Sequence, residues 1–160
     1  FFRLNKCLSG IDFFIMHEIN IKIKNDLSEL DKVFSKLQTF SDNNNLDKKI
    51  IFNLHLALDD ILNNIISYGY TDTKSHFIYI TIKNSKRSVR LSIKDDSQKW
   101  NLTKKSDPDI TKSIGEKKIG GLGIYLIKNL FDTVDYKRKN GKNLLSLEIN
   151  NYGNQKPERN

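Results

Sequence analysis

The sequence has few of the residues that form disulfides or zinc sites. Its 160 residues include one cysteine, Cys7, so the chain can form neither an internal disulfide nor a cysteine-based zinc site. The three histidines, His17, His55 and His76, lie far apart along the chain. These absences argue against a disulfide-stapled secreted domain, and we expect a reducing, cytoplasmic setting.

Long apolar runs are also absent. A membrane-spanning helix needs about 18 consecutive apolar residues. The most apolar stretch, residues 54–66, is interrupted by four polar residues, Asp59, Asp60, Asn63 and Asn64. Residues 1–15 have neither the continuous apolar core nor the small-residue cleavage site of a signal peptide, and we interpret them as an extension or remnant. We therefore expect no membrane association.

The charge balance is basic but not concentrated. The chain carries 27 basic and 19 acidic residues and a formal net charge of +8, which can indicate nucleic acid or an acidic partner. Lysine supplies 22 of the 27 basic residues, and the lysines are spread over every segment instead of forming one arginine-rich stripe. We interpret the charge as a composition bias and do not expect nucleic-acid binding.

Periodicity predicts a strand and two helices in the first half of the chain. Ile19, Ile21 and Ile23 alternate with polar residues, as in a half-buried strand. Asp26 can cap a following helix, which ends near the polar run 41–45. A central helix of about 22 residues is predicted next. Its broad apolar stripe consists of Leu46, Ile50, Leu54, Leu58, Ile61, Leu62 and Ile65.

The second half of the sequence predicts two β-hairpins, which are separated by a loop and a helix. Residues 78–82 and 89–93 alternate as the strands of the first hairpin. Residues 99–118 lose periodicity and predict a long loop, after which a glycine cluster opens a third helix. An Asn140-Gly141 turn then joins the strands of the second hairpin.

Strands and helices in this order predict the fold class. We expect one domain over residues 16–150, followed by a flexible tail at 151–160. Its predicted fold is an α/β (α+β) two-layer sandwich, with a mixed, mostly antiparallel sheet and helices packed on one face.

The central helix holds the first candidate site. Asp60 and Asn64 are four residues apart and lie on one helix face, where a carboxylate can act as a general base and an amide oxygen can bind Mg²⁺. Asp59 and Asn63 form a second pair with the same spacing, and spacing does not choose between the two. A solvated polar face opposite the core is the alternative interpretation of either pair.

Two further candidates follow along the chain. Asp95, Asp96 and Ser97 stand where a strand runs into a loop, and a carboxylate there can accept a hydrogen bond from an exocyclic amine such as that of adenine. An acidic turn that merely closes the strand is equally compatible with the residues. The glycine cluster at residues 120–123 lets backbone amides approach a phosphate at a helix N-terminus, but no P-loop sequence follows it.

Three stretches in this order resemble the GHKL (Bergerat-fold) ATPases, and within them the anti-sigma factor serine/threonine-protein kinases. They are LALDDILNNIISYGY at residues 56–70, SIKDDSQKWNL at 92–102 and GGLGIYLIKNLFDTVDYKRKNGKNLLSLEI at 120–149. The third is similar in most detail, including its helix, its Asp-x-Val-x-Tyr strand and its Asn-Gly hairpin. The resemblance covers residues 16–150 and implies the histidine kinase-like ATPase fold, with ATP and Mg²⁺ as ligands.

The resemblance also implies roles for single residues. Asp60 matches the general base, Asn64 the asparagine that binds Mg²⁺, and Asp95 the aspartate that reads adenine. Ser97 replaces a family glycine beside the nucleotide, and Asp60 is one methylene shorter than the usual glutamate. The family implies nucleotide contacts for the glycine-rich helix start and the lysines before it, namely Gly120, Gly121, Leu122, Gly123, Lys117 and Lys118.

The sequence supports two hypotheses about function, an enzyme and a binding module. The resemblance implies a kinase that uses Mg-ATP to phosphorylate a serine on an anti-anti-sigma-type partner and captures a sigma factor in an alternative complex, with a homodimer as an assembly known in the family. The other hypothesis is a non-catalytic module that holds ATP, ADP or no nucleotide and acts by sequestering a partner. The aspartate at the base position motivates it, because a carboxylate displaced by roughly 1 Å loses on the order of 10²-fold in rate.

Overall fold

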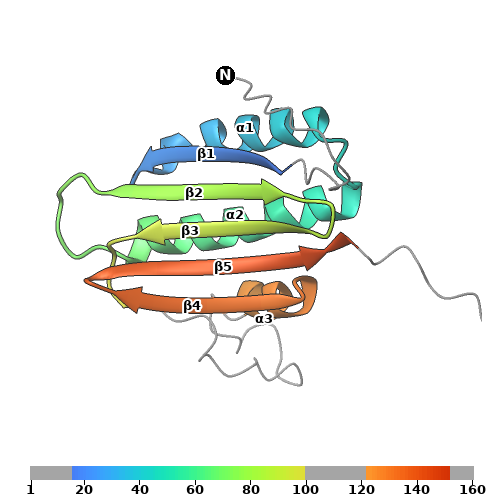
Figure 1. Ribbon diagram of the computed structural model, residues 1–160. Helices are drawn as coiled ribbons and strands as arrows, with labels where there is room; N and C mark the ends of the chain where they lie inside the picture. The colour runs from blue at the N-terminus through green and yellow to red at the C-terminus, as the bar shows by residue number, and fades with distance from the viewer. Residues whose placement is uncertain (1–15, 100–121, 152–160) are drawn as a thin grey trace, which may run out of the picture.

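Five strands form one antiparallel sheet in the computed structural model, which describes residues 16–99 and 122–151 (Figure 1). The strands are β1 (His17–Lys24), β2 (Phe77–Asn84), β3 (Ser88–Asp95), β4 (Thr133–Lys139) and β5 (Lys142–Asn150). Their order across the sheet is β1-β2-β3-β5-β4, and each of these neighbouring pairs is antiparallel. The described strands therefore form an antiparallel sheet, within the α/β class that the sequence predicted.

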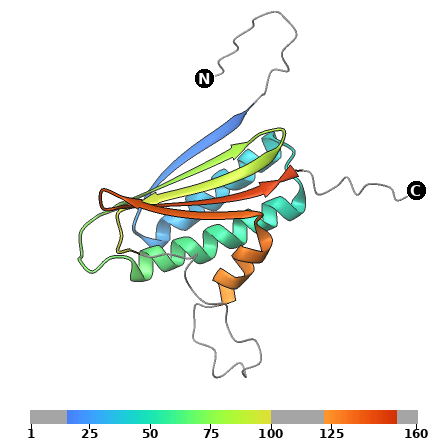
Figure 2. The ribbon, with the colours of Figure 1, turned by 60° about the horizontal axis from the view of Figure 1, so that its bottom comes forward.

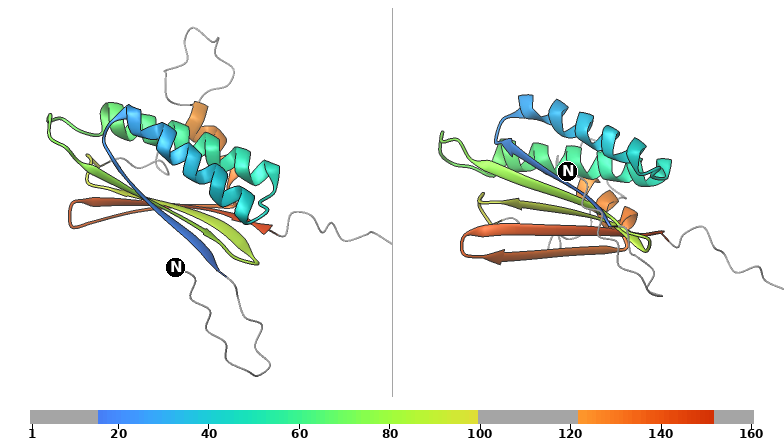
Figure 3. Two further views of the ribbon diagram at one scale, coloured as in Figure 1. Left: turned by 90° about the horizontal axis from the view of Figure 1, so that it is seen from above. Right: turned by 45° about the horizontal axis from the view of Figure 1, so that its top comes forward.

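Three helices cover one face of this sheet (Figures 2 and 3). They are α1 (Leu30–Asn43), α2 (Lys48–Tyr68) and α3 (Leu122–Leu130), and a short 3-10 turn, η1 (Leu27–Glu29), precedes α1. Helix α1 packs against β1 and α2, and α3 packs against α2. Helix α2 is thus the central helix of the layer, as predicted. No helix among the described residues is long and apolar enough to cross a membrane.

The core lies between the sheet and the helices. Strands contribute inward-facing aliphatic residues from alternate positions, such as Ile80 and Ile82 of β2 and Leu91 and Ile93 of β3. Helix α2 contributes its whole apolar stripe, which is fully buried from Leu54 to Leu62 at the helical spacing. The inward-facing strand residues and the apolar stripe of α2 therefore belong to one continuous aliphatic cluster.

Local signals explain where the elements begin and turn. Asp26 accepts a hydrogen bond from the Ser28 amide at 2.9 Å and so caps η1, which confirms the predicted cap. Helix α2 begins at Lys48, two residues after Leu46, because Asp47 accepts a hydrogen bond from the Lys49 amide at 2.7 Å. Asn140 and Gly141 both have positive φ, 51° and 75°, as the predicted hairpin turn requires.

Candidate functional site

The two acid–amide pairs on α2 differ in burial. Asp59 is exposed, and the Asn63 amide donates to its Oδ1 atom at 3.1 Å and to its carbonyl at 2.7 Å. Asp60 and Asn64 are partly buried, and the Oδ2 atom of Asp60 is shielded from solvent. Nδ2 of Asn64 donates to the Asp60 carbonyl at 2.6 Å, so its Oδ1 atom is the end that can ligate a cation. The Asp60 pair is therefore the one that lies toward the molecule's interior.

Asp95 occupies the last position of β3 and is 5% exposed. Its Oδ1 atom accepts hydrogen bonds from the Ser97 amide at 2.8 Å and from Nδ2 of Asn143 at 2.9 Å. Among the described residues, hydrogen bonds reach this carboxylate at Oδ1, which leaves Oδ2 to accept from a ligand amine. Asp96, its neighbour, is exposed and faces the other side of the sheet. The structure thus separates the two adjacent aspartates that the sequence left equivalent.

Asn143 is the centre of the polar network around Asp95. It is 4% exposed and lies directly opposite Asp95 in the β3–β5 register. Its Nδ2 atom also approaches the Ser97 hydroxyl at 3.1 Å, while its Oδ1 atom accepts from the Tyr136 hydroxyl at 2.7 Å and from the Arg138 guanidinium. The Arg138 guanidinium also donates to the Ser97 carbonyl at 2.9 Å. The oxygen and the nitrogen of the Asn143 side-chain amide therefore both form hydrogen bonds, which fixes the position of Asp95.

Gly69 connects this network to the end of α2. The Gln98 amide donates to the Gly69 carbonyl at 2.8 Å. A Cβ atom added at Gly69 would lie 2.8 Å from the Ser97 Cβ and 2.4 Å from the Ile65 carbonyl oxygen, closer than real Cβ contacts. Since Ser97 itself is 3% exposed, its side chain occupies the space that the missing Gly69 side chain leaves open. Asn64 lies five residues before Gly69, about 7.5 Å along the helix axis.

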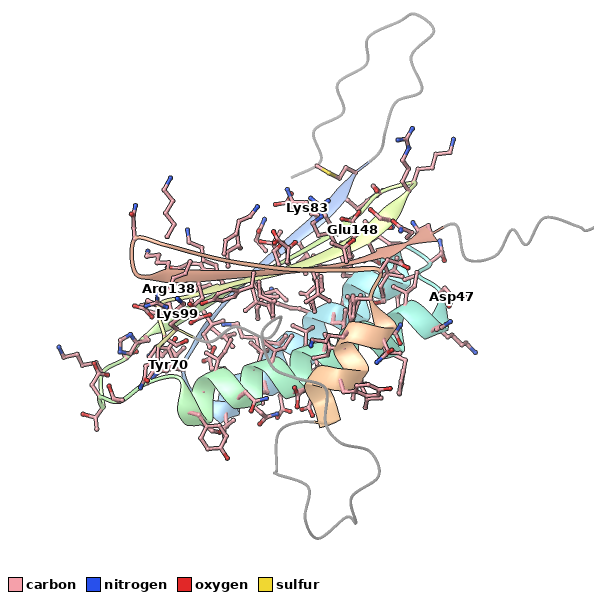
Figure 4. All side chains as sticks on the ribbon, turned by 90° about the horizontal axis from the view of Figure 1, so that it is seen from below. Asp47, Tyr70, Lys83, Lys99, Arg138 and Glu148 are labelled. Carbon is pink, nitrogen blue, oxygen red and sulfur yellow. The ribbon has the colours of Figure 1, made fainter. Side chains whose placement is uncertain are left out.

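A second polar cluster lies at the surface beside this end of the sheet. The His76 ring contacts Asp72 through Nε2 at 2.9 Å and Asp96 through Nδ1 at 3.2 Å. Tyr70 stacks on the same ring at a centroid distance of 4.3 Å. The Asp72 carboxylate, and after it Asp96, raises the pKa of His76. Burial, and after it the charges of Asp95 and Asp96, raises the pKa of the Tyr70 hydroxyl. Figure 4 shows Tyr70, Lys99 and Arg138 at one end of the molecule and Asp47 at the other.

A hydrogen bond joins helix α3 to α2. Nδ2 of Asn53 donates to the Leu130 carbonyl at 3.3 Å, and Asn53 is 3% exposed. Asn53 therefore has a structural role on the stripe that also carries Asp60 and Asn64. Leu122 and Gly123 stand in the first turn of α3. The remaining predicted phosphate contacts, Gly120, Gly121, Lys117 and Lys118, lie outside the described residues, as does nearly all of the predicted 99–118 loop.

The donor set suits a magnesium nucleotide. Asp60 and Asn64 offer carboxylate and amide oxygens, which are the hard donors that Mg²⁺ prefers. Asp95 offers a buried carboxylate oxygen held in place by two donors, a geometry suited to reading one ligand amine. The C-terminal half of α2 thus carries an oxygen pair for a cation, and the end of β3 carries an acceptor for a base.

Sequence reasoning did not identify Asn143 or Arg138. The alternation of β5 carried a signal for Asn143, because Leu145 and Leu147 face the core and residue 143 has the same parity. A polar residue at an inward position marks a buried hydrogen-bond network. Arg138 has the parity of the half-buried Val134 and Tyr136 in β4, so the same test would have found it.

Comparisons with known proteins agree with this architecture. The family model of the histidine kinase-like ATPase domain matches residues 23–149. The serine/threonine-protein kinase BtrW of Bordetella bronchiseptica is 30% identical over 99 residues, which cover 62% of this chain and 70% of that protein. A crystal structure of the RsbU and RsbW domains of Rv1364c from Mycobacterium tuberculosis shares the fold, with a TM-score of 0.57 and 15% identity over 83% of this chain. The alignment covers 32% of that longer chain. The chain described here belongs to the histidine kinase-like ATPase domain family.

Proposed function

We propose that residues 16–150 form a protein serine kinase domain that binds Mg-ATP and phosphorylates a serine of an anti-anti-sigma-type protein. The observation that carries this proposal is the buried Asp95, oriented by Ser97 and Asn143, at the end of the sheet where α2 also ends. Family membership supports ATP as the nucleotide, and the name of the Bordetella relative supports a serine or threonine acceptor.

Adenine recognition is assigned to Asp95. Its Oδ2 atom accepts a hydrogen bond from the exocyclic amine, while Oδ1 keeps its bonds to the Ser97 amide and Asn143. A guanine base presents a carbonyl oxygen at the equivalent position, so two acceptors would face each other without a proton between them. The site therefore prefers adenine nucleotides. Ser97 contributes its backbone amide, and its side chain packs at Gly69.

The acceptor serine loses its proton to Asp60. The serine oxygen forms a bond to the γ-phosphorus, the bond from that phosphorus to the β,γ-bridging oxygen breaks, and ADP leaves with the electron pair. The partly buried carboxylate of Asp60 takes the serine proton. Asn64 would hold Mg²⁺, which when bound neutralises charge on the phosphates. Gly120, Gly121, Leu122, Gly123, Lys117 and Lys118 are proposed as further phosphate contacts.

Partner switching completes the proposal. Phosphorylation of the anti-anti-sigma-type protein would release it and leave the kinase able to capture a sigma factor, in the cytoplasm and as a homodimer. A non-catalytic module that sequesters its partner is the second candidate. Its support is Asp60 itself, because an aspartate is shorter than the family's usual glutamate.

Calorimetric titration with Mg-ATP tests the nucleotide site. We expect Asp95→Asn to weaken binding by about 10²-fold, because the amide presents a donor where the base amine needs an acceptor. Asn64→Ala should weaken Mg-ATP binding and leave binding of Mg²⁺-free ATP nearly unchanged. Asn63→Ala is the matched control, one residue earlier on α2 and bonded to the exposed Asp59, and should bind like wild type. Equal affinity of wild type and Asp95→Asn would refute the assignment.

Phosphate transfer separates the two candidates. ATP labelled at the γ-phosphate is incubated with a serine-bearing anti-anti-sigma-type protein, and label on the partner and release of ADP are both measured. A kinase labels the partner, and Asp60→Ala lowers the rate by about 10²-fold or more, while Asp59→Ala leaves it unchanged. Tight ATP binding without labelled partner or released ADP would instead establish the sequestering module.

A further inference from the structure

The sheet face opposite the helices carries two different kinds of surface. No described helix covers this face (Figure 3). Because alternate strand residues share a face, the register places the outward residues in rows that cross the strands. The rows nearest the start of β1 differ in charge from those near its end, and this difference is the observation that the inference rests on.

The charged side chains in the row nearest the start of β1 neutralise one another. It contains Glu18, Lys83, Arg90 and Glu148, in register across four strands. Lys83 pairs with Glu18 at 2.9 Å, and Arg90 pairs with Glu148 at 2.6 Å. Both glutamates have lowered pKa values, through bonds to Asn20 for Glu18 and to Ser88 and then Arg90 for Glu148. Lys83 and Glu148 project from this face in Figure 4. This row offers no net charge to a partner.

The rows near the end of β1 combine lysines with exposed apolar side chains. We call them the basic–aromatic platform, and define it as Lys22, Phe77, Tyr79, Lys94, Leu144 and Lys142. Lys22, Tyr79, Lys94 and Leu144 are consecutive partners across the register. Phe77, Tyr79 and Leu144 are 39%, 43% and 41% exposed, although large apolar side chains are otherwise buried along these strands.

The lysines of the platform are not neutralised by nearby acids. Among the described residues, Lys22, Lys94 and Lys142 form no ion pair, whereas Lys137 at the platform's edge pairs with Asp135 at 3.2 Å. The Lys22 ammonium lies 3.9 Å from the Phe77 ring centroid and 5.5 Å from that of Tyr79. A cavity of about 120 Å³, which Asp95 also lines, opens between Phe77, Tyr79, Lys94 and Lys142, with Asp96 on its wall. That acid is engaged with the His76 ring.

We propose that the basic–aromatic platform is a docking surface for an acidic polypeptide segment that presents carboxylates and aliphatic side chains in turn along one face of an extended chain, at every second residue. Carboxylates would pair with Lys22, Lys94 and Lys142, and aliphatic side chains would cover Tyr79 and Leu144 and enter the cavity. Three strand spacings of about 4.8 Å make the four-residue row roughly 14 Å long, which an extended segment of about five residues spans. Asp95 lies between this cavity and the nucleotide site that is proposed on the helix side of the sheet.

Two other occupants fit the observations less well. Nucleic-acid bases stack on open aromatic faces, but the Lys22 ammonium already lies over both rings. A second copy of the chain, docked about a two-fold axis, would bring platform lysines against platform lysines, and such like-charge contacts are unfavourable. An acidic polypeptide satisfies the charges and covers the apolar atoms at the same time.

Fluorescence anisotropy with the full chain tests the proposal. The probe is a labelled peptide of about eight residues in which glutamate and leucine alternate at every second position with serine between them, and a companion peptide has serine in place of leucine. Wild type should bind the first peptide about tenfold more tightly than the second, because the aliphatic side chains add buried apolar area. The double variant Lys22→Glu/Lys94→Glu should lose about tenfold or more in affinity for the first peptide.

Controls distinguish the platform from general basic charge. Lys36→Glu/Lys49→Glu reverses two exposed lysines on the helix layer and should change peptide affinity by less than about twofold. The denaturant midpoint should stay close to that of wild type in both double variants, which verifies that each is folded. Tighter binding of an oligothymidylate probe, lost in Lys22→Glu/Lys94→Glu, would overturn the proposal in favour of nucleic acid. Conversion of a dimer to a monomer by that variant would assign the surface to self-association, and equal binding of both peptides would also overturn the proposal.

Discussion

The space between the sheet and α2 has an aliphatic interior and a polar end. In the interior, Leu58, Ile61 and Leu62 are fully buried against the inward residues of β2 and β3. At the polar end, Asp95, Ser97 and Asn143 are just as inaccessible, at 5%, 3% and 4% exposure, but each is held by directional hydrogen bonds. The stability of the interior depends on how well its side chains fill the available volume. The structure of the polar end depends on which hydrogen-bond partner each side chain has. Stability and ligand recognition are therefore assigned to different parts of one core.

Truncation of the interior should give the largest loss of stability. Leu58→Ala removes buried methyl groups at a position with no exposed surface, and we expect the free energy of unfolding to fall by about 3 kcal/mol. Denaturant titration measures this loss. Mg-ATP affinity of the remaining folded protein should change little, since Leu58 belongs to the aliphatic cluster and not to the hydrogen-bonded polar network. A large loss of Mg-ATP affinity with little loss of stability would contradict the proposed division between a stabilising interior and a ligand-binding polar end.

Substitution at the polar end should give a smaller loss of stability and a larger loss of ligand binding. Asn143→Leu keeps the side-chain volume but removes the donor to Asp95 and the acceptor for Tyr136 and Arg138. We expect about 2 kcal/mol of destabilisation from unsatisfied buried groups. Mg-ATP affinity should fall by about tenfold or more, because Asp95 is no longer held in position.

The same strand provides the control for that substitution. Asn150→Leu places the identical change at an exposed position at the far end of β5 and should leave both stability and affinity near those of wild type. If Asn143→Leu lowers stability but leaves Mg-ATP affinity unchanged, then Asn143 supports the fold and does not position Asp95.

Most of the fold was predictable because its signals are local. Alternation predicted the strands of both hairpins, and the Asn140-Gly141 turn fixed the pairing of the second. The first helix was predicted to follow directly from its cap, yet Leu27–Glu29 form a 3-10 turn before α1 begins. Such end effects depend on tertiary contacts of single residues, which periodicity does not contain.

The site was less predictable because its residues are brought together by the sheet. Spacing alone could not choose between Asp59 and Asp60, since both flank the same broad apolar stripe, and burial now distinguishes them. Asn143 is 48 residues from Asp95 along the chain. Only the β3–β5 register brings them opposite each other. The roles assigned to Asp60, Asn64 and Asp95 remain predictions that the binding and transfer experiments address.

The exposed cluster beside the polar end should show the smallest effect and a distinct pH dependence. Hydrogen bonds to Asp72, and then to Asp96, raise the pKa of His76 above its ordinary value of 6.5, and the bond to His76 lowers the pKa of Asp72 below 3.8. A raised histidine pKa stabilises the folded state fully below 6.5, and this contribution is lost as the pH rises through the folded value. A lowered carboxyl pKa stabilises it above 3.8, and this contribution is lost as the pH falls through the folded value.

The cluster should therefore contribute most to stability between pH 3.8 and pH 6.5. The difference in unfolding free energy between wild type and His76→Gln, measured by denaturant titration across pH, should shrink above that window. Proton NMR titration of the His76 ring should give a pKa above 6.5, and Asp72→Asn should move this pKa back toward 6.5, because it removes the largest cause of the shift. A wild-type pKa at or below 6.5 would show that the two carboxylates do not stabilise the charged ring. The effect should be smaller than that of Asn143→Leu, since solvent screens an exposed cluster and does not reach the buried network.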